Sequence, residues 1–148
     1  MTGPTNTQFT VGLHALTLLS HLGGPLSSEF IAASAGANPV YVRRVLGRLR
    51  DAGYVASRPG VRGGWQLLRD PADLTLGDVW RVIAGDQPAL LGVHHADPNC
   101  DAGQDIQATL EAVERRAARA VEAELDAIAI ADLTPDLAAS LRRRLGAA

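Results

Sequence analysis

The sequence predicts a mostly α-helical fold: a winged helix-turn-helix with a two-stranded wing, followed by a long C-terminal dimerisation helix. Three observations predict it. Helical apolar patterns precede residue 53, a glycine-rich hairpin pattern covers 54–69, and an apolar line with a spacing of about 3.6 residues runs from 106 to 128. We divide the 148 residues into a winged helix-turn-helix domain at 1–85, a loop at 86–103, and a dimerisation helix plus C-terminal helix at 104–148.

Start and stop signals define the helices ahead of the hairpin. The first helical pattern ends at a Gly-Gly-Pro sequence, and a short second helix begins with Ser27 or Ser28 as its N-cap. Asn38 and Pro39 then supply an N-cap and a first-turn proline, which is a strong start for a third helix. Its apolar residues at i, i+3, i+4 and i+7 predict one buried face: Val42, Val45, Leu46 and Leu49.

Positive charge is concentrated in the segment 38–69. Seven arginines and Asp51 give this segment a net charge of +6, whereas fourteen acids and seven arginines give residues 70–148 a net charge of −7. Such asymmetry is typical of a chain that binds a polyanion through one segment. The face of the third helix opposite the buried one includes Gly47, and glycine there costs about 1 kcal/mol relative to alanine, so we expect a partner to approach the backbone closely.

The basic hairpin narrows the choice of polyanion. Two short strands at 54–58 and 65–69 are joined by a glycine-rich tip that carries Arg62, and Trp65 is expected in the hairpin core. The tip matches neither nucleotide-binding glycine motif and opens a strand instead of a helix. A basic wing beside a basic helix favours double-stranded DNA, with the helix in the major groove and the wing on the adjacent backbone or minor groove.

The stretch "NPVYVRRVLGRLRDAGYVASRPGVRGGWQLLRDPADLTLGDVWRVI" closely resembles the DNA-binding region of the Rrf family of bacterial transcription regulators. The family pairs an N-terminal winged helix with a long dimerisation helix, and the resemblance covers nearly the whole chain. It implies DNA contacts by Asn38, Tyr41, Arg43 and Arg44 from the third helix and by Arg58, Arg62, Gly63 and Gly64 from the wing. Val40, on the outer face of the third helix, and Arg48, beside that face, complete the predicted contact set.

The cysteine content departs from the family pattern. Cluster-binding members carry three cysteines before the dimerisation helix, whereas this chain has Cys100 alone. Iron–sulfur clusters are held chiefly by several thiolates, so we expect no cofactor, no cluster and no metal site. His94, His95 and Asp97 precede Cys100, which leaves two interpretations open: a thiol sensor, or a surface loop with an inert thiol.

The expected partners are a double-stranded DNA operator and a second copy of the chain. The predicted dimerisation residues form one helical line: Ile106, Leu110, Val113, Ala117, Val121, Leu125 and Ile128. No apolar stretch is long enough to span a membrane and no signal peptide is evident, so we expect a cytoplasmic protein without a membrane partner. The sequence identifies no effector.

The function that these observations favour is a sequence-specific DNA-binding transcriptional regulator, acting as a homodimeric repressor and responding to a thiol-reactive signal if Cys100 is a sensor. One alternative is a winged-helix module for protein interaction, which would not need unpaired arginines at both groove and wing positions. The other is an enzyme that pairs Cys100 with His94 or His95. That alternative ranks last because no Cys/His/Asn signature is present.

Overall fold

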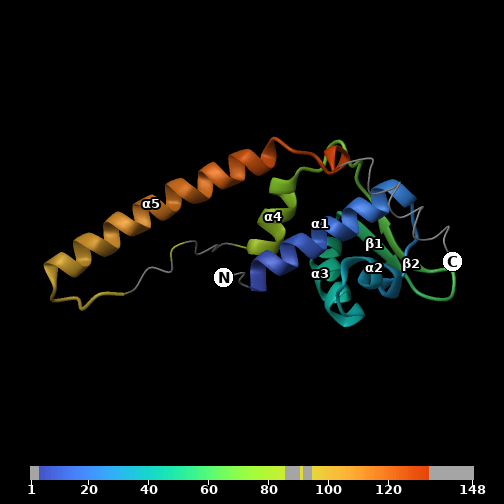
Figure 1. The fold of residues 1–148 in the computed structure, drawn as a ribbon, viewed down its shortest axis with the longest axis horizontal. Coiled ribbons are helices and arrows are strands. Elements are labelled where there is room, and N and C mark those ends of the chain that lie inside the picture. The colour runs from blue at the N-terminus through green and yellow to red at the C-terminus, as the bar shows by residue number, and fades with distance from the viewer. Residues whose placement is uncertain (1–3, 86–90, 92–94, 134–148) are drawn as a thin grey trace.

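The structure, a computed structural model, describes residues 4–85, 91 and 95–133. Four helices and a hairpin form the N-terminal part, and a fifth helix extends away from them (Figure 1). This confirms the predicted mostly helical fold with a two-stranded sheet and a long C-terminal helix. The elements are α1 (Pro4–Leu22), α2 (Ser28–Ala35), α3 (Pro39–Asp51), β1 (Val55–Arg58), β2 (Gly64–Leu67), α4 (Leu76–Ala84), α5 (Asp101–Asp126) and a 3-10 turn η1 (Ile130–Asp132).

The helix caps follow the start signals in the sequence. The Asn38 side chain accepts a hydrogen bond from the Val40 amide at 2.8 Å and starts α3, with Pro39 in its first turn. Ser27 accepts from the Phe30 amide at 3.1 Å and starts α2. These contacts satisfy amides that have no partner inside the helix. The Asn38 cap lies in the short connection between α2 and α3 that a helix-turn-helix requires.

One apolar core lies between α1, α2, α3 and α4 and extends under the wing. The face of α3 predicted to be buried is completely inaccessible, and it packs against α1 and α4. Burial of this stripe orients α3, because the opposite face of the helix must then point outward. The outward face is the one that carries the charged residues of α3.

The wing is held in place by its tryptophan. Strands β1 and β2 pair antiparallel, from Val55 opposite Leu67 to Arg58 opposite Gly64. Trp65 is buried as predicted, and its indole N–H donates to the Ser28 hydroxyl at 2.9 Å. Its backbone N–H and C=O also pair with Leu26, at 2.8 and 2.9 Å. The wing is therefore fixed to the start of α2 by one side-chain and two backbone hydrogen bonds.

The long helix differs from the prediction at both ends. It begins at Asp101 instead of Gln104 and ends at Asp126, so the expectation that the helix includes the whole apolar line to residue 128 is wrong. Beyond the helix the chain becomes extended, Ala129 pairs with Thr75, and Ile130 is fully buried in the core. This last segment belongs to the packing of the N-terminal part of the chain.

Two predicted dimerisation residues fall in this corrected region. Leu125 is half-buried and packs against the core of its own chain. Ile128 lies beyond the end of α5, in the extended segment, where its carbonyl accepts from the Leu76 amide at 2.9 Å. The apolar line thus continues in phase to Ile128, but its last two residues contact α4 and the core of the same chain.

The rest of the line stays on the surface of α5. Ile106, Leu110, Val113 and Val121 are exposed, by 38 to 61%, and Ala117 is half-buried. The predicted C-terminal helix from residue 134 lies outside the described residues. Within the described part of the chain, no helix combines the length and apolar character needed to cross a membrane.

Candidate nucleic-acid interface

The N-terminal half of α3 presents its polar face to solvent. Val40 is 57% exposed, and Arg43 and Arg44 are exposed beside it. Asn38 is exposed, although its side-chain oxygen is engaged as the cap. Tyr41 is half-buried against the core, so only part of its ring faces outward. The end of a helix with this set of side chains can enter a DNA groove.

The wing adds two exposed arginines next to this face. Arg58 ends β1 and Arg62 lies in the tip. The adjacent glycines are explained by the shape of the wing: a Cβ on Gly63 would lie 2.0 Å from the Arg58 carbonyl oxygen, and a Cβ on Gly64 would lie 2.6 Å from the Leu26 carbonyl oxygen. The Gly63 amide donates to the Gly60 carbonyl at 3.0 Å, so it is not free for a phosphate. The wing therefore offers charge mainly through its arginines.

A hollow separates α3 from the wing. It brings together predicted residues of both elements, since Arg43, Arg58, Gly63 and Gly64 all line it. Gly47 lines it as well, and the nearest atom to a Cβ there would be Arg50 Nη2 at 3.9 Å. Nothing within the described chain requires glycine at this position, which leaves the backbone of α3 open to a close external partner.

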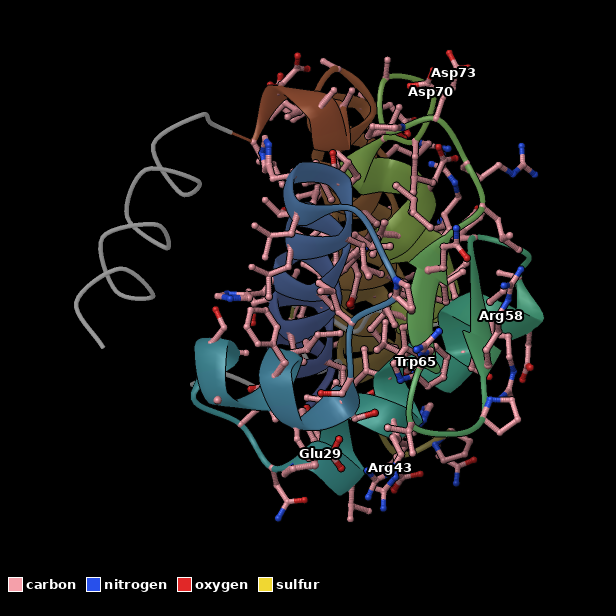
Figure 2. The ribbon with its side chains drawn as sticks, turned by 90° about the vertical axis from the view of Figure 1, so that its right-hand side faces the viewer. Glu29, Arg43, Arg58, Trp65, Asp70 and Asp73 are labelled. Atoms are coloured by element: carbon pink, nitrogen blue, oxygen red, sulfur yellow. The ribbon has the colours of Figure 1, made fainter. Side chains whose placement is uncertain are left out.

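The charges on α3 and the wing are mostly positive, and three of the arginines are unpaired. Within the described residues, Arg44, Arg58 and Arg62 form no ion pair or hydrogen bond through their side chains. Arg43 pairs with Glu29 at 3.1 Å. Figure 2 shows Glu29 and Arg43 at the lower end of the molecule and Arg58 on one side at about mid-height, whereas the acids Asp70 and Asp73 lie at the upper end. The segregated charge suits a polyanion.

One predicted contact residue is directed elsewhere. Arg48 donates from Nη1 to the Gln8 side-chain oxygen at 2.9 Å, and it does not line the hollow. Its guanidinium joins α3 to α1 inside the chain. Two charged lining residues were missed by sequence reasoning, Glu29 and Arg50. The signal for Glu29 was its position as the only acid among the first fifty residues.

The predicted Cys/His site is not assembled in the described part of the chain. Cys100 is exposed and precedes the first residue of α5. The ring of His95 lies next to Gln107: His95 Nδ1 and the side-chain nitrogen Nε2 of Gln107 are 3.5 Å apart. No interaction joins His95 to Cys100. His94 lies outside the described residues.

Comparisons with known proteins agree with this geometry. The family model for Rrf2, an iron-dependent transcriptional regulator, matches residues 5–136. The chain is 38% identical over 129 residues to YwnA of Bacillus subtilis, assigned to the HTH-type transcriptional regulators, covering 86% of this chain and 95% of YwnA.

Two solved structures show the same fold. One is a protein from Lactobacillus plantarum assigned as a transcriptional regulator, with a TM-score of 0.72, 26% identity, and 95% and 98% of the two chains covered. The other is CymR, the global cysteine regulator of B. subtilis, with a TM-score of 0.61, 29% identity, and 86% and 92% covered. The family match over nearly the whole chain shows that this protein belongs to the Rrf2 family of transcriptional regulators.

Proposed function

We propose that the chain is a homodimeric repressor that binds a double-stranded DNA operator through α3 and the wing. The observation that carries the proposal is the set of exposed arginines that are unpaired within the described residues and stand on both elements: Arg44 on α3, and Arg58 and Arg62 on the wing. A repressor of this kind acts by occluding the promoter. As a regulator of chromosomal DNA, it would work in the cytoplasm.

The two elements have different tasks in this proposal. Asn38, Val40, Tyr41, Arg43 and Arg44 enter the major groove at the start of α3, where arginine side chains can read guanine. Arg58 and Arg62 contact phosphates or the minor groove, while the two wing glycines shape the turn that presents them. Arg48 contributes indirectly, since it holds α3 against α1.

The homodimer is proposed from the surface of α5. The exposed apolar residues of α5 lie on one side of a 26-residue helix of which no residue is fully buried. A helix of this length is stabilised mainly by burial of its apolar face, and a second copy supplies a matching face. The dimerisation set is Ile106, Leu110, Val113, Ala117 and Val121. Two DNA-binding halves then meet half-sites about one helical turn apart, or a multiple of it.

Selection of bound fragments from genomic DNA, followed by footprinting, tests the proposal. We expect a pseudo-palindromic site and a dimer by sedimentation. Replacing Leu110 and Val113 together with Asp should give a monomer with much weaker operator binding. The matched control places Asp at Ala108 and Ala123, exposed alanines off the apolar stripe, and should remain dimeric. A monomeric wild type at micromolar concentration would contradict the dimer.

The residues present do not fit an iron–sulfur cluster. Cys100 is the only cysteine of the sequence, and its thiol is exposed. Among the described residues, no group of three or more His, Cys, Asp or Glu side chains could hold a metal ion. We therefore propose that regulation in this chain does not depend on a bound cluster, unlike that of the iron-dependent members after which the family model is described.

The candidate thiol sensor stays a prediction. Cys100 lies at the start of the proposed dimerisation helix, where a modified thiol could change the angle between the two DNA-binding halves. Operator binding by the wild type and Cys100→Ser, reduced and after mild peroxide, tests it. Loss of binding in the oxidised wild type alone would support a sensor, and identical binding in all four samples would exclude a peroxide sensor at Cys100.

A further inference from the structure

An acidic side chain lies inside the arginine-rich face. Glu29, in the first turn of α2, lines the hollow between α3 and the wing together with Arg43, Arg50 and Arg58. Its carboxylate accepts a hydrogen bond from Arg43 Nη1 at 3.1 Å, reaching from α2 across to α3 (Figure 2). DNA phosphates repel an acid on the surface that binds them, so Glu29 opposes part of the attraction that the arginines supply.

A purely structural role accounts for only part of this arrangement. An acid in the first turn of a helix interacts favourably with the N-terminal dipole, and Glu29 occupies such a position in α2. That role would be met by a carboxylate pointing into solvent. The carboxylate instead holds the guanidinium of a predicted base-reading residue, although both side chains are substantially exposed, by 68% and 48%. The pair therefore affects how Arg43 meets DNA.

We propose that Glu29 is a specificity-determining residue that holds Arg43 back from phosphates and in position for a base edge. The inference rests on the proposed DNA-binding function. On non-operator DNA, a phosphate that accepts a hydrogen bond from Arg43 lies close to the Glu29 carboxylate as well, and the two negative charges repel each other. Non-specific binding, which depends on phosphate contacts, is weakened.

On the operator the pair need not break. A guanidinium has five N–H donors, and within the described chain Glu29 engages only Nη1 of Arg43. Nη2 and Nε are left to donate to a base edge while the carboxylate keeps the plane of the group fixed. Arginine donating two hydrogen bonds to guanine is the commonest specific contact in the major groove. Glu29 therefore weakens binding to the operator less than it weakens binding to non-operator DNA.

The test compares wild type with Glu29→Gln on two duplexes of equal length, one containing the selected operator and one without it, at several salt concentrations. We expect the variant to bind the non-operator duplex about 3- to 10-fold more tightly, with a smaller change on the operator. The slope of log K against log salt on non-operator DNA should steepen by about one, because Arg43 gains a phosphate. In an Arg43→Met background, Glu29→Gln should leave that slope unchanged.

Glu29→Asp is the matched control, because it keeps the first-turn charge of α2 but shortens the reach to Arg43. We expect thermal stability close to wild type and a partial loss of discrimination between the two duplexes. If Glu29→Gln weakens both duplexes equally, or changes neither, Glu29 does not set specificity. If the wild type binds neither duplex, the proposed function itself fails, which is a separate result.

Discussion

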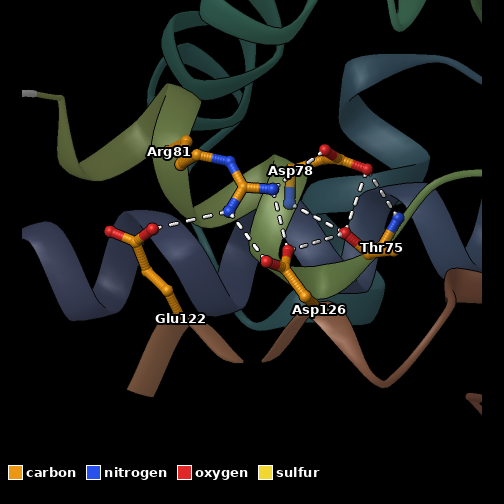
Figure 3. A network of polar contacts seen from close by, with 5 residues as sticks. All are labelled: Thr75, Asp78, Arg81, Glu122 and Asp126. Atoms are coloured by element: carbon orange, nitrogen blue, oxygen red, sulfur yellow. Dashed lines mark hydrogen bonds and ion pairs between the residues drawn. The ribbon is translucent and has the colours of Figure 1, made fainter. Parts of the chain in front are cut away.

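Arginines serve two different purposes in the two halves of this molecule. At the junction of α4 and α5, Arg81 is surrounded by three carboxylates: Asp126 at 2.8 Å, Asp78 at 3.2 Å and Glu122 at 3.5 Å (Figure 3). On the face formed by α3 and the wing, Arg44, Arg58 and Arg62 have no carboxylate partner among the described residues. The residue type is the same, but its surroundings differ.

The charges at the junction satisfy one another. The hydrogen bond with Asp126 is the main cause that raises the pKa of Arg81, and the same bond lowers the pKa of Asp126. Burial raises the pKa of Asp78, but hydrogen bonds from Thr75 and Arg81 outweigh it, so the net pKa lies below the usual value. Thr75 and Asp78 also form a capping box at the start of α4. The junction needs no external ion.

The difference separates residues that hold the chain together, at the α4–α5 junction, from residues that bind an external partner, on the face formed by α3 and the wing. An arginine with several carboxylates contributes to the attachment of one element to another, whereas exposed arginines without a carboxylate partner raise the potential of a surface and attract an external anion. Substitutions at the junction should therefore change stability, and substitutions on the α3–wing face should change DNA binding. Each of the following predictions tests one side of this separation.

The largest expected effect is on stability, at the buried residue Ile130 that holds the end of the α5 segment in the core. Ile130 follows α5 and is fully buried in the N-terminal core. Ile130→Ala removes buried methyl groups and leaves a cavity, so we expect a loss of about 2–5 kcal/mol in the free energy of unfolding. Urea unfolding followed by circular dichroism measures it. The neighbouring Ile128→Ala is the control: Ile128 is 39% exposed, and its loss should be clearly smaller. Equal losses would mean that the anchor is not at Ile130.

The second effect is on DNA binding, at the α3–wing face. Arg44 is exposed and has no side-chain partner among the described residues, so Arg44→Ala should leave the melting temperature unchanged. Operator binding should weaken by about 1–3 kcal/mol, with relaxed preference at one base pair. Arg62→Ala, on the wing, should instead weaken binding to all sequences and reduce the salt slope by about one. Equal losses of both variants on every sequence would contradict the division between α3 and the wing.

Much of the α3–wing face could be predicted from the sequence because its signals are local. The Asn38-Pro39 start, the apolar stripe of α3 and the glycine-rich tip each lie within a few residues, and short-range rules apply to them. The buried position of Trp65 followed from the same hairpin pattern.

The contacts that were missed join residues far apart in the sequence. Arg81 and Asp126 are 45 positions apart, and Glu29 and Arg43 are 14 apart on different helices, so periodicity within one element contains no information about them. The end of α5 was misjudged for a related reason. Ile128 lies in phase with the apolar line although the chain there is extended, and only the pairing of Ala129 with Thr75 reveals the change.

A smaller effect is expected when the polar network of the junction is broken. Arg81→Met keeps much of the side-chain volume but leaves three carboxylates without their cation. Exposed ion pairs contribute about 0–1 kcal/mol each, and Arg81 is 44% exposed, so we expect a loss of about 1 kcal/mol in the free energy of unfolding. Arg81→Lys, the conservative control, should recover part of it. Unchanged stability in Arg81→Met would show that the network does not contribute to attachment.

The smallest effect is a change in the acid dependence of stability. A carboxyl group whose pKa is lower in the folded chain stabilises the fold above its unfolded pKa, about 3.9 for aspartate, and this contribution is lost as the pH falls through the folded value. Asp78 and Asp126 both have lowered pKa values, so the network contributes fully at neutral pH and fades below about pH 4.

Urea unfolding of wild type and Arg81→Met between pH 7 and pH 2.5 checks this dependence. The difference in stability between the two proteins should be constant from pH 7 to about pH 5 and shrink at lower pH, because the carboxylates of the wild type then become protonated. Burial lowers the pKa of His14, which adds a pH dependence of its own, but both proteins share it and it cancels in the difference. Arg44→Ala is the matched control, since its difference from wild type should stay near zero at every pH. A difference for Arg81→Met that is independent of pH would mean that packing of the Arg81 side chain, and not its pairing with Asp78 and Asp126, attaches α5 to α4.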